Sequence, residues 1–193
     1  MSPIRQKSKN LILHVEQIRD KEFFQEFEED PQAFSIIAEM IKNRECEFFG
    51  PLNIRLKAFR IRELYEVQGT FSTRVRLACS RCLKDFETML TSTFELTYVK
   101  EVPGLLDVLD EREVELKVEE IGLMYFKGEE INLHQGIQEQ VVMAFPLQPL
   151  CDENCKGLCP QCGLDLNRGD CGCARGPGAN PFAVLKNLKL NKK

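Results

Sequence analysis

Apolar and polar residues alternate along two neighbouring stretches of the chain, which predicts two long β-strands. The apolar positions of the first stretch are Tyr65, Val67, Phe71, Val75, Leu77 and Cys79. The apolar positions of the second stretch are Phe86, Leu90, Phe94, Leu96 and Tyr98. A period of two places these side chains on one face of a sheet and the polar residues between them on the other. Because only residues 80–85 join the two stretches, we expect an antiparallel hairpin with one buried face.

Shorter patterns predict further strands around this hairpin. Residues 53–58 also alternate, but the phase slips at Phe59 and resumes at Ile61. One extra residue in a strand produces such a slip, so we expect a β-bulge at Phe59. Residues 11–15 predict a short strand, and residues 125–131 predict a strand that contains a turn or a bulge.

Two other stretches have the period of amphipathic helices. The first follows Asp30, a suitable N-cap, and extends from about Pro31 to Asn43. Its apolar stripe consists of Phe34, Ile37, Ala38 and Ile41. The second begins after Asn132, which we expect to form a capping box with Gln135, and it ends before Pro146. Its apolar stripe consists of Leu133, Ile137, Val141 and Ala144.

Composition and charge narrow the class of protein. The chain has 193 residues, of which 43% are hydrophobic, so it can bury a sizeable core. Its net charge of -4 conceals two locally basic regions, residues 53–100 and 166–193. A dedicated nucleic-acid binder has a stronger basic excess over the whole chain. No stretch reaches the ~20 apolar residues of a membrane span and no secretory leader is evident, so we expect a cytoplasmic protein without a membrane partner.

Eight of the nine cysteines occur in two groups, which indicates a chemical role such as metal binding rather than packing in the core. In a reducing cytoplasm, clustered cysteines are more often metal ligands than structural disulfides. The segment from Cys159 to Gly163 has the form of a zinc knuckle, in which a tight turn directs two sulfurs inward. Cys171 and Cys173 follow at a usable distance. Since four thiolates satisfy tetrahedral Zn²⁺, we predict a first zinc site made of Cys159, Cys162, Cys171 and Cys173.

The remaining cysteines leave two partitions open. Cys79, Cys82, Cys151 and Cys155 form another set of four, and a second zinc there would tie the Cys-rich segment to the hairpin. Alternatively, the six C-terminal cysteines hold one zinc, and Cys79 and Cys82 are buried or redox-active thiols. An iron–sulfur cluster also needs four thiolates, whereas disulfides would need an oxidising compartment. Cys46 stands apart, and we interpret it as a small apolar residue.

Basic residues on the hairpin and near the C-terminus are the candidates for RNA contact. They are Arg74, Arg76, Arg81, Lys84, Lys186 and Lys189. Such side chains contact phosphates in nucleic-acid complexes, but an ordinary solvated surface has the same composition. His14 and His134 have no catalytic partners in the sequence, and no nucleotide-binding fingerprint occurs. We therefore expect no catalytic residues, no small-molecule substrate and no enzyme activity.

Together these patterns predict an α+β fold, with an antiparallel β-sheet core, a few helices and a C-terminal Cys-rich zinc-binding segment. We expect residues 11–150 to form the α+β domain and residues 151–175 to form the zinc segment packed on it. We expect residues 176–193 to form a linker and a short basic helix or tail, with helical character over 181–188. The acidic residues 101–120 predict a surface loop.

Four segments have sequences that are specific in combination. They are Cys79–Leu83, Pro146–Cys151, Cys155–Gly163 and Asn180–Leu185. With their order along the chain, from about Leu11 to Leu188, they closely resemble the YceD family of large ribosomal RNA subunit accumulation proteins. The resemblance implies a protein of bacterial type, with plastid relatives, that is linked to accumulation of large-subunit ribosomal RNA.

We therefore expect a non-enzymatic ribosome biogenesis factor that supports the accumulation or processing of large-subunit ribosomal RNA. It would act by binding that RNA or pre-ribosomal particles. One alternative is a protein–protein adaptor that docks a ribosomal protein or a nuclease. Another is a redox-sensing zinc protein in which Cys79 and Cys82 release the metal on oxidation.

Overall fold

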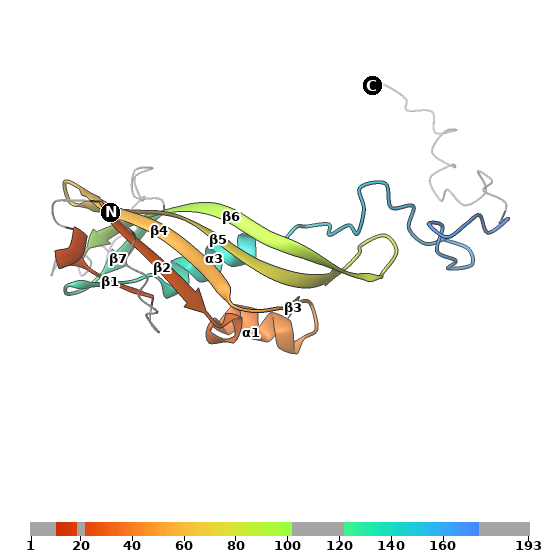
Figure 1. Cartoon of the computed structure of the whole chain (residues 1–193), viewed down its shortest axis with the longest axis horizontal. Helices are drawn as coiled ribbons and strands as arrows, with labels where there is room; N and C mark the ends of the chain where they lie inside the picture. Colours follow the sequence, from red (N-terminus) through yellow and green to blue (C-terminus); the bar gives the residue numbers. More distant parts are fainter. Residues whose placement is uncertain (1–10, 19–21, 102–121, 174–193) are drawn as a thin grey trace, which may run out of the picture.

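A six-stranded sheet forms the centre of the structure (Figure 1). The computed structural model describes residues 11–18, 22–101 and 122–173. The predicted C-terminal helix, with Lys186 and Lys189, lies outside these residues, as does nearly all of the predicted acidic loop. The strand order is β2-β4-β5-β6-β7, and β3 pairs with β5 beyond the N-terminal end of β4. These strands are β2 (Phe23–Glu29), β3 (Glu47–Phe48), β4 (Leu52–Ile61), β5 (Leu64–Ala78), β6 (Asp85–Lys100) and β7 (Leu123–Phe126).

A small second sheet and two α-helices complete the described fold, which confirms the α+β class. Strand β1 (Ile12–His14) pairs antiparallel with β8 (Glu130–Asn132). The helices are α1 (Ser35–Lys42) and α3 (His134–Met143), and short 3₁₀ turns are η1 (Val15–Ile18) and η2 (Pro31–Ala33). Buried side chains of both α-helices join the core that the inner face of the large sheet forms. Neither described α-helix has the length and apolar composition that crossing a membrane requires.

The β5–β6 hairpin is the longest element of the fold, and it confirms the alternating pattern of the sequence. Its antiparallel register ends with Ala78 opposite Asp85, next to the turn at the tip. The predicted apolar positions of both strands are buried, except for half-buried Phe86. One inward position is Gly69, and the ring of the facing Phe94 covers it so closely that an added Cβ would lie 2.5 Å from Cζ. The tip of the hairpin extends beyond the helices (Figure 1).

Two details of the strand predictions need correction. The β-bulge predicted at Phe59 is wrong, because β4 pairs one-to-one with β5 as far as Ile61. Phe59 packs on the outer face, with the ammonium of Lys57 4.8 Å from its ring centroid, and Ile61 is 50% exposed. Both side chains lie on the outer face, so the alternation of inward and outward residues continues unbroken along β4. The stretch 125–131 contains the end of β7 and the start of β8, separated by a turn at Gly128.

Strand β7 also makes the sheet mixed rather than wholly antiparallel. It pairs in parallel with β6, with Thr97 opposite Leu123 and Lys100 opposite Phe126. A parallel neighbour requires a long connection between the two strands, and more than twenty residues separate β6 from β7 here. All other strand pairs of the described residues are antiparallel.

The single helix predicted from Pro31 to Asn43 is divided, because extended Phe34 separates the 3₁₀ turn η2 from α1. The carboxylate of Asp30 accepts a hydrogen bond from the backbone N–H of Gln32 at 2.9 Å, which confirms the cap. The α-helix itself starts only at Ser35. It is joined to α3 by Gln138, whose side-chain oxygen accepts a hydrogen bond from the backbone N–H of Ile36 at 3.0 Å.

The capping box predicted for α3 is wrong, because the N-cap is Leu133 rather than Asn132 and has no side-chain hydrogen bond. Asn132 lies one residue earlier, and its side chain accepts a hydrogen bond from the backbone N–H of His134 at 2.9 Å. Gln135 instead donates to Glu139 one turn further along, at 3.0 Å. A side-chain pair four residues apart on the helix surface is available to Gln135, and it replaces the return contact of a capping box.

Candidate metal centres

The tip of the β5–β6 hairpin carries the first pair of clustered cysteines. Cys79 follows β5 directly, and the turn closes through two backbone hydrogen bonds of 2.9 Å. They join Cys79 N to Lys84 O and Leu83 N to Cys79 O. Leu83 has a left-handed conformation with φ 58, which lets the chain reverse within this short turn. Cys79 and Cys82 are both buried there.

The second pair of cysteines comes from the segment after α3, which runs on toward the tip of the hairpin (Figure 1). The carbonyl of Pro149 accepts a hydrogen bond from Ser80 N at 2.8 Å, and this contact brings Cys151 to the hairpin tip. The chain then turns at Asp152, whose carbonyl accepts a hydrogen bond from Cys155 N at 3.0 Å. The turn directs Cys155 back toward the hairpin.

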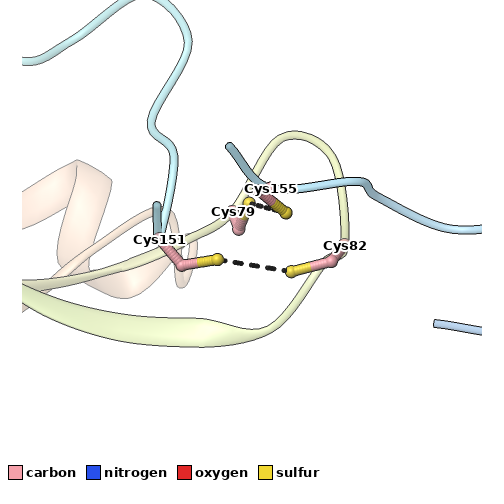
Figure 2. Close-up of side chains that lie close together, drawn as sticks. All are labelled: Cys79, Cys82, Cys151 and Cys155. Atoms are coloured by element: carbon pink, nitrogen blue, oxygen red, sulfur yellow. Dashed lines mark hydrogen bonds between the residues drawn. The ribbon is translucent and has the colours of Figure 1, made fainter. Parts of the chain in front are cut away.

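These cysteines form one group, called the junction cluster below. Its members are Cys79, Cys82, Cys151 and Cys155. The sulfur atoms of Cys79 and Cys155 lie 3.8 Å apart, and those of Cys82 and Cys151 lie 3.6 Å apart (Figure 2). Since all four sulfurs lie within 4.8 Å of one another, the junction cluster could hold one metal ion.

A second group of four cysteines, called the terminal cluster below, lies entirely in the last described segment. Its members are Cys159, Cys162, Cys171 and Cys173. Their sulfurs also lie within 4.8 Å of one another. The knuckle closes through hydrogen bonds from Gly163 N to Cys159 O at 2.9 Å and from Cys159 N to Leu164 O at 2.8 Å. The structure thus brings together both sets of four cysteines that the sequence suggested, while their roles as ligands stay a prediction.

Hydrogen bonds within each cluster give its thiols different pKa values. The backbone of Cys151 is the main cause that lowers the pKa of Cys79 to about 6. The backbone of Cys162 likewise lowers the pKa of Cys159 to about 6. In contrast, the side-chain contact with Cys162 and other neighbouring thiols, together with burial, raises the pKa of Cys173 to about 12. A thiol must lose its proton before it can bind a metal ion, so metal binding at either cluster would release protons.

Arg81 and Lys84, both predicted to contact RNA, attach the Cys-rich segment to the hairpin. The Arg81 guanidinium donates hydrogen bonds to the carbonyls of Cys155 at 2.9 Å and Glu153 at 3.2 Å. Lys84 forms an ion pair with the carboxylate of Asp165. This contact is the main reason that the pKa of Asp165 is lowered to about 2. Both basic side chains therefore have internal partners at the junction.

The other two basic residues of the hairpin differ from each other. Arg76 has internal partners, because its guanidinium pairs with Glu47 at 2.8 Å and with Glu87 at 3.0 Å. Arg74 is exposed, and its guanidinium has no ion-pair partner among the described residues. Contact of any of these residues with RNA stays a prediction.

Three residues that shape this region were not identified from the sequence: Gly157, Asp165 and Asn167. Gly157 has φ +74, and a Cβ there would lie 2.9 Å from the carbonyl oxygen of Arg81. Asn167 N donates to the side chain of Asp165 at 3.0 Å. The spacing Asp-x-Asn is a signal for a local turn, but it carries no information about the distant partner Lys84.

A family model described as "Large ribosomal RNA subunit accumulation protein YceD" matches residues 67–189. The matched range contains both cysteine clusters and nearly all of the β5–β6 hairpin. No solved structure matches the chain.

Curated relatives resemble the chain over part of their length. The protein named "Large ribosomal RNA subunit accumulation protein YCED homolog 1, chloroplastic" of Arabidopsis thaliana is 25% identical over 156 residues, which are 72% of this chain and 49% of that protein. Its namesake in Zea mays is 24% identical, covering 64% of this chain and 48% of the relative. An uncharacterized protein of Mycobacterium tuberculosis is 28% identical, covering 60% of this chain and 51% of the relative. The chain thus spans about half the length of the curated relatives it matches.

Proposed function

Since the chain belongs to the YceD family of large ribosomal RNA subunit accumulation proteins, we propose that it supports the accumulation or processing of large-subunit ribosomal RNA. It does so by binding that RNA or pre-ribosomal particles. The observation that carries this proposal is the family match itself, because it covers the hairpin and both cysteine clusters. We infer that the function depends on this matched part of the chain.

We propose further that each cluster binds one Zn²⁺ ion. A tetrahedral zinc with Zn–S bonds of about 2.3 Å places its sulfurs about 3.8 Å apart. The two closest sulfur pairs of the junction cluster are separated by 3.6 Å and 3.8 Å, which supports this geometry. A four-iron cluster inserts iron and sulfide between the thiolates and therefore holds them farther apart. Sets of four thiolates without carboxylates also disfavour magnesium and calcium.

The role proposed for zinc is structural, and the protein is not an enzyme in this proposal. Four thiolates fill a tetrahedral coordination shell, so the metal offers no position for an activated water molecule. Zinc at the junction cluster would instead fix the hairpin tip to the segment after α3, because two of its ligands come from each of these parts. The geometry of the surrounding surface then depends on the metal.

Arg74 is the residue of the hairpin that we propose for direct RNA contact. It is exposed on the outer face, and no internal carboxylate of the described residues neutralises it. Arg76, Arg81 and Lys84 have internal partners, so their positive charge is partly satisfied before any RNA binds. Contacts of arginine with phosphate give affinity that falls as salt increases.

Crosslinking of the protein to RNA in cells, followed by sequencing of the bound RNA, tests the proposed function. We expect reads from large-subunit ribosomal RNA or its precursor to be enriched over small-subunit reads. Cells without the protein should also show a lower ratio of large- to small-subunit RNA. Crosslinked reads that do not differ from those of a non-binding control protein would contradict direct RNA binding.

An adaptor function is the second candidate, because three leucines are exposed in the segments next to the clusters. Leu83 is 67% exposed at the hairpin tip, Leu147 is 101% exposed before Cys151, and Leu164 is 46% exposed after the knuckle. An adaptor would use such exposed apolar side chains to contact a ribosomal protein or a nuclease, provided that they gather in one patch. Recovery of one such protein that survives RNase treatment, together with salt-independent RNA association, would favour this candidate over the first.

A further inference from the structure

The side-chain amide of Asn167 reaches the junction cluster from the loop that carries two members of the terminal cluster. Its Nδ2 donates a hydrogen bond to the sulfur of Cys155, a member of the junction cluster, at 3.4 Å. Its Oδ1 accepts a hydrogen bond from the backbone N–H of Lys156 at 2.8 Å. In the chain, however, Asn167 belongs to the loop between Cys162 and Cys171, which are members of the terminal cluster. One residue of the terminal loop therefore contacts a sulfur of the other cluster.

Asp165 holds this amide in place and ties the same loop to the hairpin. Its Oδ1 accepts hydrogen bonds from the backbone N–H of Asn167 at 3.0 Å and from Nδ2 at 2.8 Å. Its Oδ2 pairs with Lys84 at the hairpin tip. A backbone hydrogen bond from Leu166 N to Gly157 O at 2.9 Å adds to the contact. The loop thus touches both parts of the chain that supply ligands to the junction cluster.

The two clusters differ in how much chain must be ordered before each can form. The terminal cluster takes all its members from one short segment, Cys159–Cys173. The junction cluster pairs cysteines that are 69 and 76 residues apart. Because the entropy lost on closing a loop grows with its length, the terminal cluster can assemble locally, whereas the junction cluster needs the segment to dock first.

We propose that a metal ion bound at the terminal cluster raises the metal affinity of the junction cluster, and that Asn167 is the positioning residue for this coupling. A metal at the terminal cluster closes the loop between Cys162 and Cys171, so the loop is already ordered when the junction cluster binds its ion. The amide N–H then stabilises the negative charge on the Cys155 thiolate, as donors around metal ligands commonly do. Coupling of this kind is reciprocal. The inference rests on the proposal that both clusters bind zinc.

Zinc titration of the full-length chain against a chromophoric chelator tests this coupling. Alkylation after each chelator step, read by mass spectrometry, reports protection of Cys82 in the junction cluster and of Cys162 in the terminal cluster. Disabling the terminal cluster with Cys171→Ser and Cys173→Ser should weaken zinc binding at the junction cluster by about 10- to 100-fold. Asn167→Ala should produce a loss in the same range at the junction cluster and leave the affinity of the terminal cluster unchanged when the junction cluster is empty.

A double-mutant comparison shows whether Asn167 carries the effect. In the Asn167→Ala chain, disabling the terminal cluster should cause little further loss at the junction cluster. Asn154→Ala is the matched control, because Asn154 is exposed in the same segment and its side chain has no hydrogen bond to the described residues. It should leave both affinities unchanged.

The outcomes separate the coupling from the zinc proposal. Two zinc ions that bind with the same affinity whether or not the other cluster is intact would overturn the coupling alone. If disabling the terminal cluster weakened zinc binding at the junction cluster as much in the Asn167→Ala chain as in the wild-type chain, the role of Asn167 would be overturned. Purified chain that binds no zinc at either cluster would overturn the zinc proposal and this inference with it. Asn167→Ala removes no ligand, so its result does not depend on variants that lack a cysteine.

Discussion

The sulfur of Cys82 lies 3.6 Å from the sulfur of Cys151, although 69 residues separate them in the chain. The contact joins the hairpin tip to the segment that follows α3. Among the described residues, the core formed by the sheet and helices gains no buried member after Val141, and Cys79, Cys82 and Cys155 form a separate small buried cluster. Packing of the main core therefore does not hold the Cys-rich segment in place. The contacts of Arg81 and Lys84 hold it at the hairpin tip, and in our proposal a metal ion at the junction cluster adds to them.

The first prediction concerns metal content. Replacement of Cys82 by serine removes a thiolate from the junction cluster and leaves the terminal cluster intact. We expect the wild-type chain to contain two zinc ions and the Cys82→Ser chain to contain one. Without its metal the segment after α3 should undock, so the amides of Ser80 and Leu158 should exchange hydrogen faster. Elemental analysis and hydrogen exchange measure the two effects.

Cys46→Ala is the matched control for this prediction. Cys46 is 6% exposed in the main core and belongs to neither cluster of four cysteines. The substitution should lower the free energy of unfolding by about 1 kcal/mol and leave both zinc ions in place. Two zinc ions retained in Cys82→Ser, or one lost in Cys46→Ala, would contradict the assignment of the junction cluster.

The second prediction compares two glycines with the same backbone conformation. Gly157 and Gly163 both have φ +74, so alanine at either position is strained by about 1–2 kcal/mol. Only at Gly157 would the new Cβ also meet a neighbour, the carbonyl oxygen of Arg81 at 2.9 Å; at Gly163 nothing lies within 4 Å. Gly157→Ala should therefore undock the segment more than Gly163→Ala does. Hydrogen exchange at Leu158, which donates to that carbonyl, measures the difference, and equal exchange in both variants would count against the close approach.

Local patterns in the sequence account for most of what could be predicted. The hairpin followed from strict alternation, because a buried face imposes the same period along both strands. The N-cap at Asp30 followed from residue types next to each other in the chain. Counting the cysteines suggested the two groups of four, and the position of Cys79 and Cys82 at a hairpin tip suggested how the junction cluster would be assembled.

The features that could not be predicted depend on contacts between distant residues. Alternation alone does not reveal that Phe59 packs on the outer face under Lys57, so an apolar residue out of phase was misread as a bulge. The pairing of Lys84 with Asp165 has no local signature, and the same lysine looks like an RNA contact when only its charge is known. The parallel pairing of β7 likewise depends on the path of a long connection.

The third prediction tests how α3 packs against the sheet. Gly136 is buried on the inner side of α3, and a Cβ there would lie 2.9 Å from Leu96 Cδ1 and 2.9 Å from the hydroxyl of Tyr98. Helix propensity alone favours Gly136→Ala by about 1 kcal/mol. Overpacking of a well-filled core opposes it by about 1–3 kcal/mol, so we expect a net loss in the free energy of unfolding. Urea unfolding measures it, and a gain in stability would show that α3 moves away from β6 at little cost.

The last prediction tests the proposed contact of Arg74 with RNA. If its guanidinium meets a phosphate, Arg74→Ala should weaken binding to the crosslinked fragment of large-subunit RNA and reduce the slope of log affinity against log salt by about 1. Arg62→Ala is the matched control, because Arg62 is also exposed but lies in the turn at the opposite end of β5. Both variants change the net charge equally. Fluorescence anisotropy over a series of salt concentrations measures the slopes. A reduced slope in Arg74→Ala alone supports the contact, whereas equal slopes in the two variants would show that the outer face of the hairpin tip does not bind the RNA backbone through this residue.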